Sequence, residues 1–283
     1  MHFVKMEGCG NDYVYVDGSR EKANDKAELA KRVSDRHFGI GSDGLIFVNP
    51  GENAEFEMEM YNADGSRAEM CGNGIRCVAK FIYDRGLCSP EKKKITIESF
   101  GIPHEVELHT GDDGLVESVT VDMGEPVLKP ELIPVVSNDP ASESLIDEEI
   151  IVDGKPWRMT CVSMGNPHAV FFTEDNSFPD FERMGPSFEH HKRFPKAVNA
   201  EFAKVIDDTH VDMRVWERGS GETLACGTGA CATLVACVLN GKTKRKAEIK
   251  LRGGVLTVEW NKEDNRVYMT GPARTVFEGD ITV

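Results

Sequence analysis

The stretch MCGNG at residues 70–74 and the stretch ACGTG at residues 225–229 carry most of the information in this chain. In each, a cysteine precedes Gly-x-Gly, and a helix-like run of small and apolar residues follows, at 75–83 and 230–239. A cysteine at a helix N-terminus lies at the positive end of the helix dipole, which favours its thiolate. The glycines allow backbone N–H groups to approach a bound anion closely. Two such elements predict two thiols, Cys71 and Cys226, that face one ligand.

The two stretches belong to an internal repeat whose offset is the 155 positions between Cys71 and Cys226. At the same offset, Gly10-Asn11 matches Gly165-Asn166, and Tyr61 matches Trp216. This period is far too long for a solenoid. It predicts two similar, pseudo-symmetric domains of ordinary size, formed by residues 1–123 with 273–283 and by residues 124–272. The expected class is α+β, each domain a mixed sheet or roll wrapped round a central helix, with the active site in the cleft between them.

Composition agrees with a soluble two-domain protein. The chain has 283 residues, of which 40% are hydrophobic and 29% charged, and its formal net charge of −15 disfavours binding to nucleic acid or to an anionic membrane. No apolar run has the length of a membrane span, and the first residues lack the pattern of a signal peptide. We therefore expect a cytoplasmic location and eight reduced cysteines. The cysteine spacings do not suit zinc, so no metal is expected.

Local patterns predict several elements of the fold. Strands are expected at 14–16, 45–48 and 56–61, and a helix is expected at 25–34 with Asn24 as its cap. The two helices that follow the cysteines are apolar on more than one face, which is typical of buried helices. The acidic segment 137–149 is expected to be a surface loop.

Two facing thiols suit proton transfer at one carbon in both directions. One residue, as thiolate, removes a proton from one face of the carbon, and the other, as thiol, delivers a proton to the opposite face. Sulfur suits this role because a thiol has a pKa of roughly 8.5. The result is inversion at that carbon, for which the α-carbon of an amino acid is the natural candidate. Backbone N–H groups at the two helix N-termini would stabilise the substrate carboxylate as negative charge builds on it.

The polar residues around these motifs also have structural interpretations. Asn11, Asn62, Asn166 and Asn199 would each serve as a turn residue, and His168 as a buried structural histidine. The Glu217-Arg218 pair would form a salt bridge, and the other six cysteines would pack as small hydrophobic residues. The repeat, however, matches Asn11 with Asn166 and Asn62 with Glu217. Polar residues at equivalent places in two halves favour a shared binding site.

Taken together, these motifs closely resemble the diaminopimelate epimerases, along essentially the whole chain. The matching stretches are GCGND at 8–12, YNADGS at 61–66, MCGNGIRC at 70–77, MGNPH at 164–168, WERG at 216–219 and TLACGTGA at 223–230. The resemblance implies a pyridoxal-independent isomerase that needs no cofactor and converts LL-2,6-diaminoheptanedioate to the meso form. It also implies a place in lysine and peptidoglycan-precursor biosynthesis, and a cytoplasmic homodimer.

The resemblance also assigns roles to particular residues. Cys71 and Cys226 would be the catalytic acid and base, and the backbone of Gly72, Asn73, Gly227 and Thr228 would bind the carboxylate at the reacting centre. The remaining polar groups of the substrate would be held by Asn11, Asn62, Asn166, Asn199, Glu217 and Arg218. His168 would lie near the reacting amine or behind the residues that touch it. Some family members carry glutamine where this chain has Gly44, so only backbone contacts are expected there.

Three other functions remain open from the sequence. A racemase of histidine or proline could use the same fold, although the proline-type enzymes usually have histidine after Cys-Gly, where this chain has Asn73. A thiol–disulfide redox protein is disfavoured because no two cysteines are closely spaced. A non-catalytic amino-acid-binding protein would keep its affinity for a ligand when either cysteine is replaced.

Overall fold

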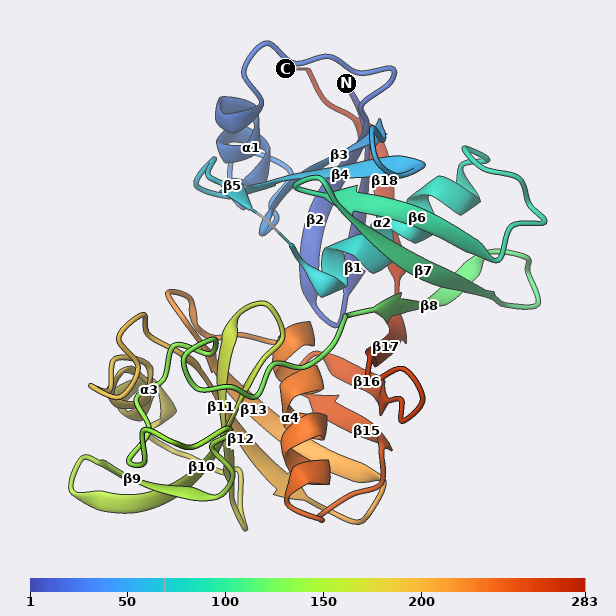
Figure 1. Ribbon diagram of the computed structural model, residues 1–283. Coiled ribbons are helices and arrows are strands. Elements are labelled where there is room, and N and C mark those ends of the chain that lie inside the picture. The colour runs from blue at the N-terminus through green and yellow to red at the C-terminus, as the bar shows by residue number, and fades with distance from the viewer. Residues whose placement is uncertain (69, 283) are drawn as a thin grey trace. The chain divides into compact units, whose positions relative to one another are not determined.

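The computed structural model of the chain describes residues 1–68 and 70–282 and divides into two compact units (Figure 1). Unit 1 is formed by Met1–Asp122 with Thr270–Val283, and unit 2 by Met123–Met269. The domain ends expected from the sequence, at residues 123 and 272, lie one and three residues later along the chain. Val283, the last residue of the expected first domain, lies outside the described residues.

Unit 1 is a mixed sheet with two helices. Its elements are β1 (His2–Gly8), β2 (Asn11–Asp17), α1 (Lys26–Ser34), β3 (Gly44–Pro50), β4 (Phe56–Asn62), β5 (Arg67–Ala68), α2 (Gly72–Asp84), β6 (Lys94–Ser99), β7 (Ile102–Thr110), β8 (Val116–Asp122) and β18 (Arg274–Asp280). Strand β1 pairs antiparallel with β2 and β18, and β3 pairs antiparallel with β4. The pairs β2–β3 and β4–β6 are parallel.

Unit 2 repeats this arrangement. Its elements are β9 (Glu148–Val152), β10 (Lys155–Ser163), β11 (Pro167–Phe172), α3 (Phe181–Glu189), β12 (Asn199–Val205), β13 (His210–Glu217), β14 (Gly221–Glu222), α4 (Gly227–Leu239), β15 (Lys246–Leu251) and β16 (Gly254–Trp260), and β17 (Val267–Pro272) spans the unit boundary. The pairs β11–β12 and β13–β15 are parallel, and β10–β11 and β12–β13 are antiparallel. The predicted α+β class with mixed sheets is confirmed.

The repeat found in the sequence has the same offset in the structure. Strand β12 begins and ends 155 residues after β3, and helix α4 begins and ends 155 residues after α2. Strand β13 follows β4 at nearly the same distance. Residues that share a sequence position in the repeat therefore share a place in their units, so Cys71 and Cys226 occupy equivalent positions.

Helices α2 and α4 are the central helices of their units (Figure 1). Helix α2 packs on β1, β2 and β8, while α4 packs on β10, β11 and β16. Both begin three residues earlier than the sequence predicted, because the Gly-x-Gly segments form the first helical turn and the cysteine before them is the N-cap. Helix α2 also buries two cations, and one of them, Lys80, pairs with Asp84 at 2.6 Å.

Other predicted elements are confirmed or need correction. The strands expected at 14–16, 45–48 and 56–61 lie within β2, β3 and β4. The N-cap of α1 is Asp25, whose side chain accepts a hydrogen bond from the Glu28 N–H at 3.0 Å, so the prediction of Asn24 was wrong. The segment 137–149 is not wholly a surface loop. Leu145 is fully buried in the core of unit 2, and β9 begins at Glu148.

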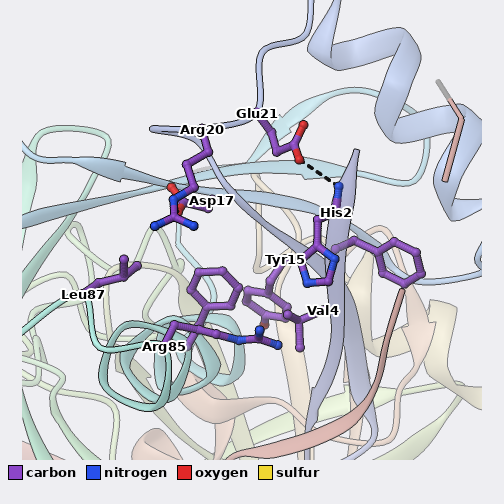
Figure 2. A pocket seen from close by; sticks show the side chains of 10 residues that line it. His2, Val4, Tyr15, Asp17, Arg20, Glu21, Arg85 and Leu87 are labelled. Carbon is purple, nitrogen blue, oxygen red and sulfur yellow. Dashed lines mark hydrogen bonds and ion pairs between the residues drawn. The ribbon is translucent and has the colours of Figure 1, made fainter. Parts of the chain in front are cut away.

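A cavity of about 360 Å³ opens in unit 1 at the C-terminal end of α2 (Figure 2). Arg85 lines it from the helix side. Asp17 lines it from the end of β2, and Arg20 lines it from the loop that follows, with its Nε 3.4 Å from Asp17 Oδ2. The Tyr15 ring also lines it, while the Tyr15 hydroxyl lies 3.4 Å from the Gly74 carbonyl oxygen in the first turn of α2. Tyr15 therefore lies between the cavity and the first turn of the helix that Cys71 caps.

The core of unit 2 is dominated by aromatic rings. Phe202 lies at their centre, with its ring centroid 5.0–5.9 Å from those of Trp157, Phe171, Phe178, Phe181 and Phe188. Most of these pairs meet edge to face, a geometry that adds roughly 0.5–1.5 kcal/mol per pair to the burial of the rings. No helix among residues 1–68 and 70–282 is long and apolar enough to cross a membrane.

We expect Phe202→Ala to lower the free energy of unfolding of unit 2 by about 3–5 kcal/mol, because it leaves a cavity at the centre of this cluster. All three tryptophans of the chain lie in unit 2, so urea unfolding followed by tryptophan fluorescence reports on it. Phe38→Ala is the matched control, since Phe38 is 93% exposed and its loss should change stability by less than about 0.5 kcal/mol. Coincident curves for Phe202→Ala and the unsubstituted protein would contradict the assignment.

Candidate active site

In unit 1, Cys71 is held by the helix that it caps. Its backbone is extended, with φ −134° and ψ 111°, and its Sγ accepts the Gly74 N–H at 3.2 Å while its carbonyl accepts the Ile75 N–H at 2.9 Å. The N–H groups of residues 72 and 73 precede the first intrahelical bond, which is where helix N-termini bind anions. The local geometry therefore places a sulfur beside an anion-binding helix end.

Asn11 is brought to Cys71 by a polar network that the sequence did not predict. The Cys71 Sγ–H donates to Asn11 Oδ1 at 3.2 Å, and Asn11 Nδ2 donates to Asp43 Oδ2 at 2.8 Å. Asp43 also accepts the Asp12 N–H at 3.1 Å and pairs with Arg36 at 3.0 Å. Because Asp43 takes the N–H side of the Asn11 amide, the oxygen side is directed to the sulfur. Asp43 is thus a positioning residue for Asn11.

Asn62 and Gly44 lie side by side in neighbouring strands, where they form a register pair of β3 and β4. Asn62 Nδ2 donates to Ser66 Oγ at 3.0 Å, within the turn that follows β4. A Cβ on Gly44 would lie 2.1 Å from the Tyr61 carbonyl oxygen and 2.7 Å from the Tyr13 ring. No side chain fits there without moving backbone, which gives a physical reason for glycine at this position.

A buried cation lies behind the Cys71 helix turn. Arg76 is fully buried, and its Nη1 donates to the Gly72 carbonyl at 3.0 Å while its Nε donates to the Pro272 carbonyl at 3.1 Å. Its Nη2 lies 3.8 Å from the Cys9 sulfur. These bonds fix the first turn of α2 and place a positive charge near it. The sequence motif contained Arg76, but the sequence analysis gave it no role.

In unit 2, Cys226 caps α4 in the same way. Its φ is −121° and its ψ 110°, and its Sγ accepts the Gly229 N–H at 3.4 Å and lies 3.5 Å from the Thr228 hydroxyl. Cys226 is more deeply buried than Cys71, with only 5% of its surface exposed. The two cysteines therefore share a backbone geometry but differ in the surroundings of the sulfur.

Those surroundings hold the Cys226 sulfur in its protonated form. Burial, followed by the nearby carboxyl groups of Glu217 and Glu201, raises the pKa of the Cys226 thiol well above its ordinary value, although Thr228 and the Gly229 N–H act in the opposite sense. The helix-dipole argument predicted a favoured thiolate, and at Cys226 desolvation outweighs it. Burial likewise raises the pKa of Glu217, whose carboxylate accepts a hydrogen bond from the Thr223 hydroxyl and contacts Cys226.

Asn199 clamps the backbone of unit 2. Its Nδ2 donates to the Pro167 carbonyl at 2.8 Å, and its Oδ1 accepts the Arg218 N–H at 2.9 Å. Arg218 itself points its guanidinium towards the Lys196 carbonyl, 3.3 Å from Nη1. In this structure, Asn199 thus joins the start of β11 to the end of β13, where Glu217 and Arg218 stand. The predicted substrate contact of Asn199 stays a prediction.

His168 lies in the interior of unit 2 and is paired with a carboxylate that the sequence analysis did not single out. Its Nδ1 is 2.6 Å from Glu201 Oε1, and its Nε2 is 2.9 Å from Asn166 Oδ1. Both His168 and Glu201 are fully buried. A signal was available in the sequence, since a glutamate in the middle of the strand NAEFAKV is unusual for a buried strand.

The structure therefore brings together some predicted residues within each unit. Cys71 contacts Asn11 in unit 1. In unit 2, Cys226 contacts Thr228 and Glu217, and Asn166 contacts His168. Asn62 is bonded to its own turn. Among residues 1–68 and 70–282, no group of three or more His, Cys, Asp or Glu side chains is arranged to hold a metal ion.

The other six cysteines are not helix caps. Burial raises the pKa of the Cys77 thiol to about 12, and it raises the pKa values of Cys9, Cys88, Cys161 and Cys237 as well. All but Cys88 are buried. This agrees with the interpretation of these residues as small hydrophobic side chains.

Comparison with known proteins finds one family along the chain. The sequence profile of the family described as "Diaminopimelate epimerase" matches residues 3–129 and 160–276. The diaminopimelate epimerase of Acetivibrio thermocellus is 56% identical over 281 residues, which are 99% of this chain and 98% of that protein. The diaminopimelate epimerase of Methanococcus maripaludis strain C5 is 55% identical over 284 residues, with 100% of both chains covered.

Solved structures with much lower sequence identity share the fold. A hydroxyproline epimerase of Agrobacterium vitis has a TM-score of 0.66 at 14% identity, with 99% of this chain and 90% of that chain covered. A Bacillus anthracis phenazine biosynthesis protein of the PhzF family has a TM-score of 0.67 at 16% identity, with 100% and 99% covered. At these identities the likeness concerns the two-domain α+β fold alone.

Because the pKa of Cys226 is raised, we expect this thiol to stay protonated at neutral pH in the free protein and to ionise only above the ordinary value of 9.0. The thiolate absorbs ultraviolet light, so the difference between pH titrations of the unsubstituted protein and Cys226→Ala isolates this group. Thr228→Ala should move the transition to still higher pH, because the Thr228 hydroxyl lowers the pKa. If the titration of Cys226→Ala instead lacks a thiol that ionises at neutral pH in the unsubstituted protein, the helix dipole outweighs burial at this sulfur and the expectation is wrong.

Proposed function

The chain belongs to the diaminopimelate epimerase family, and on that premise we propose that it interconverts LL-2,6-diaminoheptanedioate and meso-diaminopimelate without a cofactor. The observation that carries the proposal is the pair of cysteines, Cys71 and Cys226, each of which caps the buried central helix of its own unit. Inversion at a carbon needs a proton acceptor and a proton donor on opposite faces. Two equivalent sulfurs, one from each half of a duplicated chain, supply both.

We propose the following proton steps, which require Cys71 to lose the proton that it donates to Asn11 in the free structure. In the direction from LL to meso, Cys71 as thiolate takes the α-proton, so that the C–H electron pair stays on carbon. Cys226, which burial keeps as a thiol, gives its proton to the opposite face of the same carbon. The electron pair forms the new C–H bond, and Cys226 is left as thiolate. In the reverse direction the roles are exchanged, because Cys226 is then the thiolate that takes the proton and Cys71 is the thiol that gives one.

The carbanion is stabilised by the helix ends. Negative charge that builds on the substrate α-carboxylate lies best near donors fixed in advance, and a helix N-terminus offers N–H groups and a positive dipole end. We assign this role to the N–H groups of Gly72 and Asn73 on α2 and of Gly227 and Thr228 on α4. The buried Arg76 adds positive charge behind the α2 turn.

Substrate selection falls to the polar side chains. The substrate carries an amino acid group at each end, so one end must be held while the other is inverted. Arg218 suits the distal carboxylate, because a guanidinium forms paired hydrogen bonds with it. Glu217 and the asparagines Asn11, Asn62, Asn166 and Asn199 complete the set. A monoamino acid such as histidine or proline would leave these polar groups without partners and should be rejected.

We further propose that the enzyme works as a cytoplasmic homodimer in lysine and peptidoglycan-precursor biosynthesis. Light scattering on the purified protein tests the first point. A mass of twice the 31.3 kDa chain is expected, and a mass of one chain would contradict it.

Replacing either cap cysteine tests the function directly. We expect Cys71→Ala and Cys226→Ala each to lower the rate of interconversion of LL- and meso-diaminopimelate by at least about a thousandfold, because each removes one of the two proton-transfer groups. Chiral chromatography of the product measures it, with histidine and proline as competing substrates. Cys88→Ala is the matched control, since Cys88 lies beyond the C-terminal end of α2, and its activity should stay within about twofold. Full turnover by either cap variant would exclude the proposal.

A further inference from the structure

Glu201, His168 and Asn166 form a polar chain in unit 2, in which Glu201 and His168 are fully buried and Asn166 is half-buried. Strands β11 and β12 run parallel, with His168 opposite Asn199. Glu201 is two residues beyond Asn199 and thus projects from the same face of β12. Its Oε1 lies 2.6 Å from His168 Nδ1, and His168 Nε2 lies 2.9 Å from Asn166 Oδ1. The chain runs from the interior of the unit to a residue with a proposed substrate contact.

Glu201 also packs against the first turn of α4, the turn that Cys226 caps. A Cβ on Gly229 would lie 2.7 Å from Glu201 Oε1 and 3.2 Å from the Cys226 sulfur. Only a residue without a side chain lets the first turn of α4 lie against this carboxyl group. The carboxyl group therefore contacts both His168 and the turn that carries Cys226.

The proton count along the chain follows from burial. An ionised Glu201 beside a neutral imidazole would leave a net negative charge in the interior, near the Glu217 carboxylate, and that is costly. The pair is neutral if it holds two protons, one between Oε1 and Nδ1 and one on Nε2. The second proton makes Nε2 a donor, which agrees with an amide oxygen, rather than an amide nitrogen, as its partner.

We propose that Glu201 is a positioning residue which, through His168, fixes the direction of the Asn166 amide so that its Nδ2–H₂ group is left for the substrate. Glu201 anchors the ring at Nδ1, and the ring presents Nε2–H to Asn166 Oδ1. With its oxygen held, the amide offers donors to a carboxylate of the ligand. That Asn166 contacts the substrate rests on the proposed function, whereas the state of His168 does not.

Two variants of Glu201 separate this role from a purely structural one. In Glu201→Gln the new amide N–H donates to Nδ1, which keeps the proton on Nε2 and the direction of Asn166. In Glu201→Leu the side chain has a similar size, but its hydrogen bond to His168 Nδ1 is lost. We expect KM for LL-diaminopimelate within about threefold of the unsubstituted value for the glutamine variant, and raised roughly tenfold to a hundredfold for the leucine variant, with kcat changed less. Glu98→Gln, a buried carboxyl in unit 1 that binds the backbone of residues 52 and 53, is the control.

Nitrogen NMR of ¹⁵N-histidine-labelled protein reports which ring nitrogens of His168 carry a proton, and it does so without turnover. His168→Asn assigns the signal. At neutral pH we expect a protonated Nε2 in the unsubstituted protein and in Glu201→Gln. This measurement does not require the leucine variant to fold.

An unprotonated Nε2 in the unsubstituted protein would overturn the proposal. So would an unchanged KM in folded Glu201→Leu, or an equal loss in both variants, which would mean that the acid itself is needed. Absence of epimerisation by the unsubstituted protein would instead refute the proposed function and leave the NMR result to decide the role of Glu201.

Discussion

The site depends on a cysteine sulfur that takes the place of the usual oxygen at the N-cap of a buried helix. Serine, threonine, asparagine and aspartate normally fill that position because their side chains accept an N–H of the first turn. Cys71 and Cys226 do so with sulfur, to Gly74 and Gly229. One geometry thus does two things: it starts the central helix of each unit, and it fixes a sulfur beside the N–H groups of a helix end, which can bind an anion.

Duplication produced two such caps but not two identical environments. Asp43 orients Asn11 beside Cys71, whereas His168 and Glu201 orient Asn166, the residue that the repeat matches with Asn11. Carboxyl groups and burial around Cys226 keep its sulfur protonated. Such asymmetry suits a reaction in which one sulfur must begin as the acid and the other as the base.

Much of this fold could be predicted from sequence because the repeat is regular. The two cysteine motifs located α2 and α4, and hydrophobic patterns located β2, β3 and β4. Helix α3 was missed because its sequence contains Gly185 and Pro186, which normally end a helix. Gly185 is required there by tertiary packing, since a Cβ would lie 2.0 Å from the Trp216 ring. The roles of Glu201 and Asp43 were also missed because they depend on tertiary contacts. Which side chains face these two carboxyl groups cannot be derived from the spacing of residues along the sequence.

The central claim is that two different groups, one on each face of the α-carbon, carry the proton. Running the reaction in deuterium oxide and following both amino acids at early times by NMR and mass spectrometry tests it most directly. The account predicts deuterium at the inverted α-carbon of nearly every product molecule and almost none in the remaining substrate, because the donor thiol exchanges with water. Product without the label, or label entering the substrate as fast as the product, would contradict it.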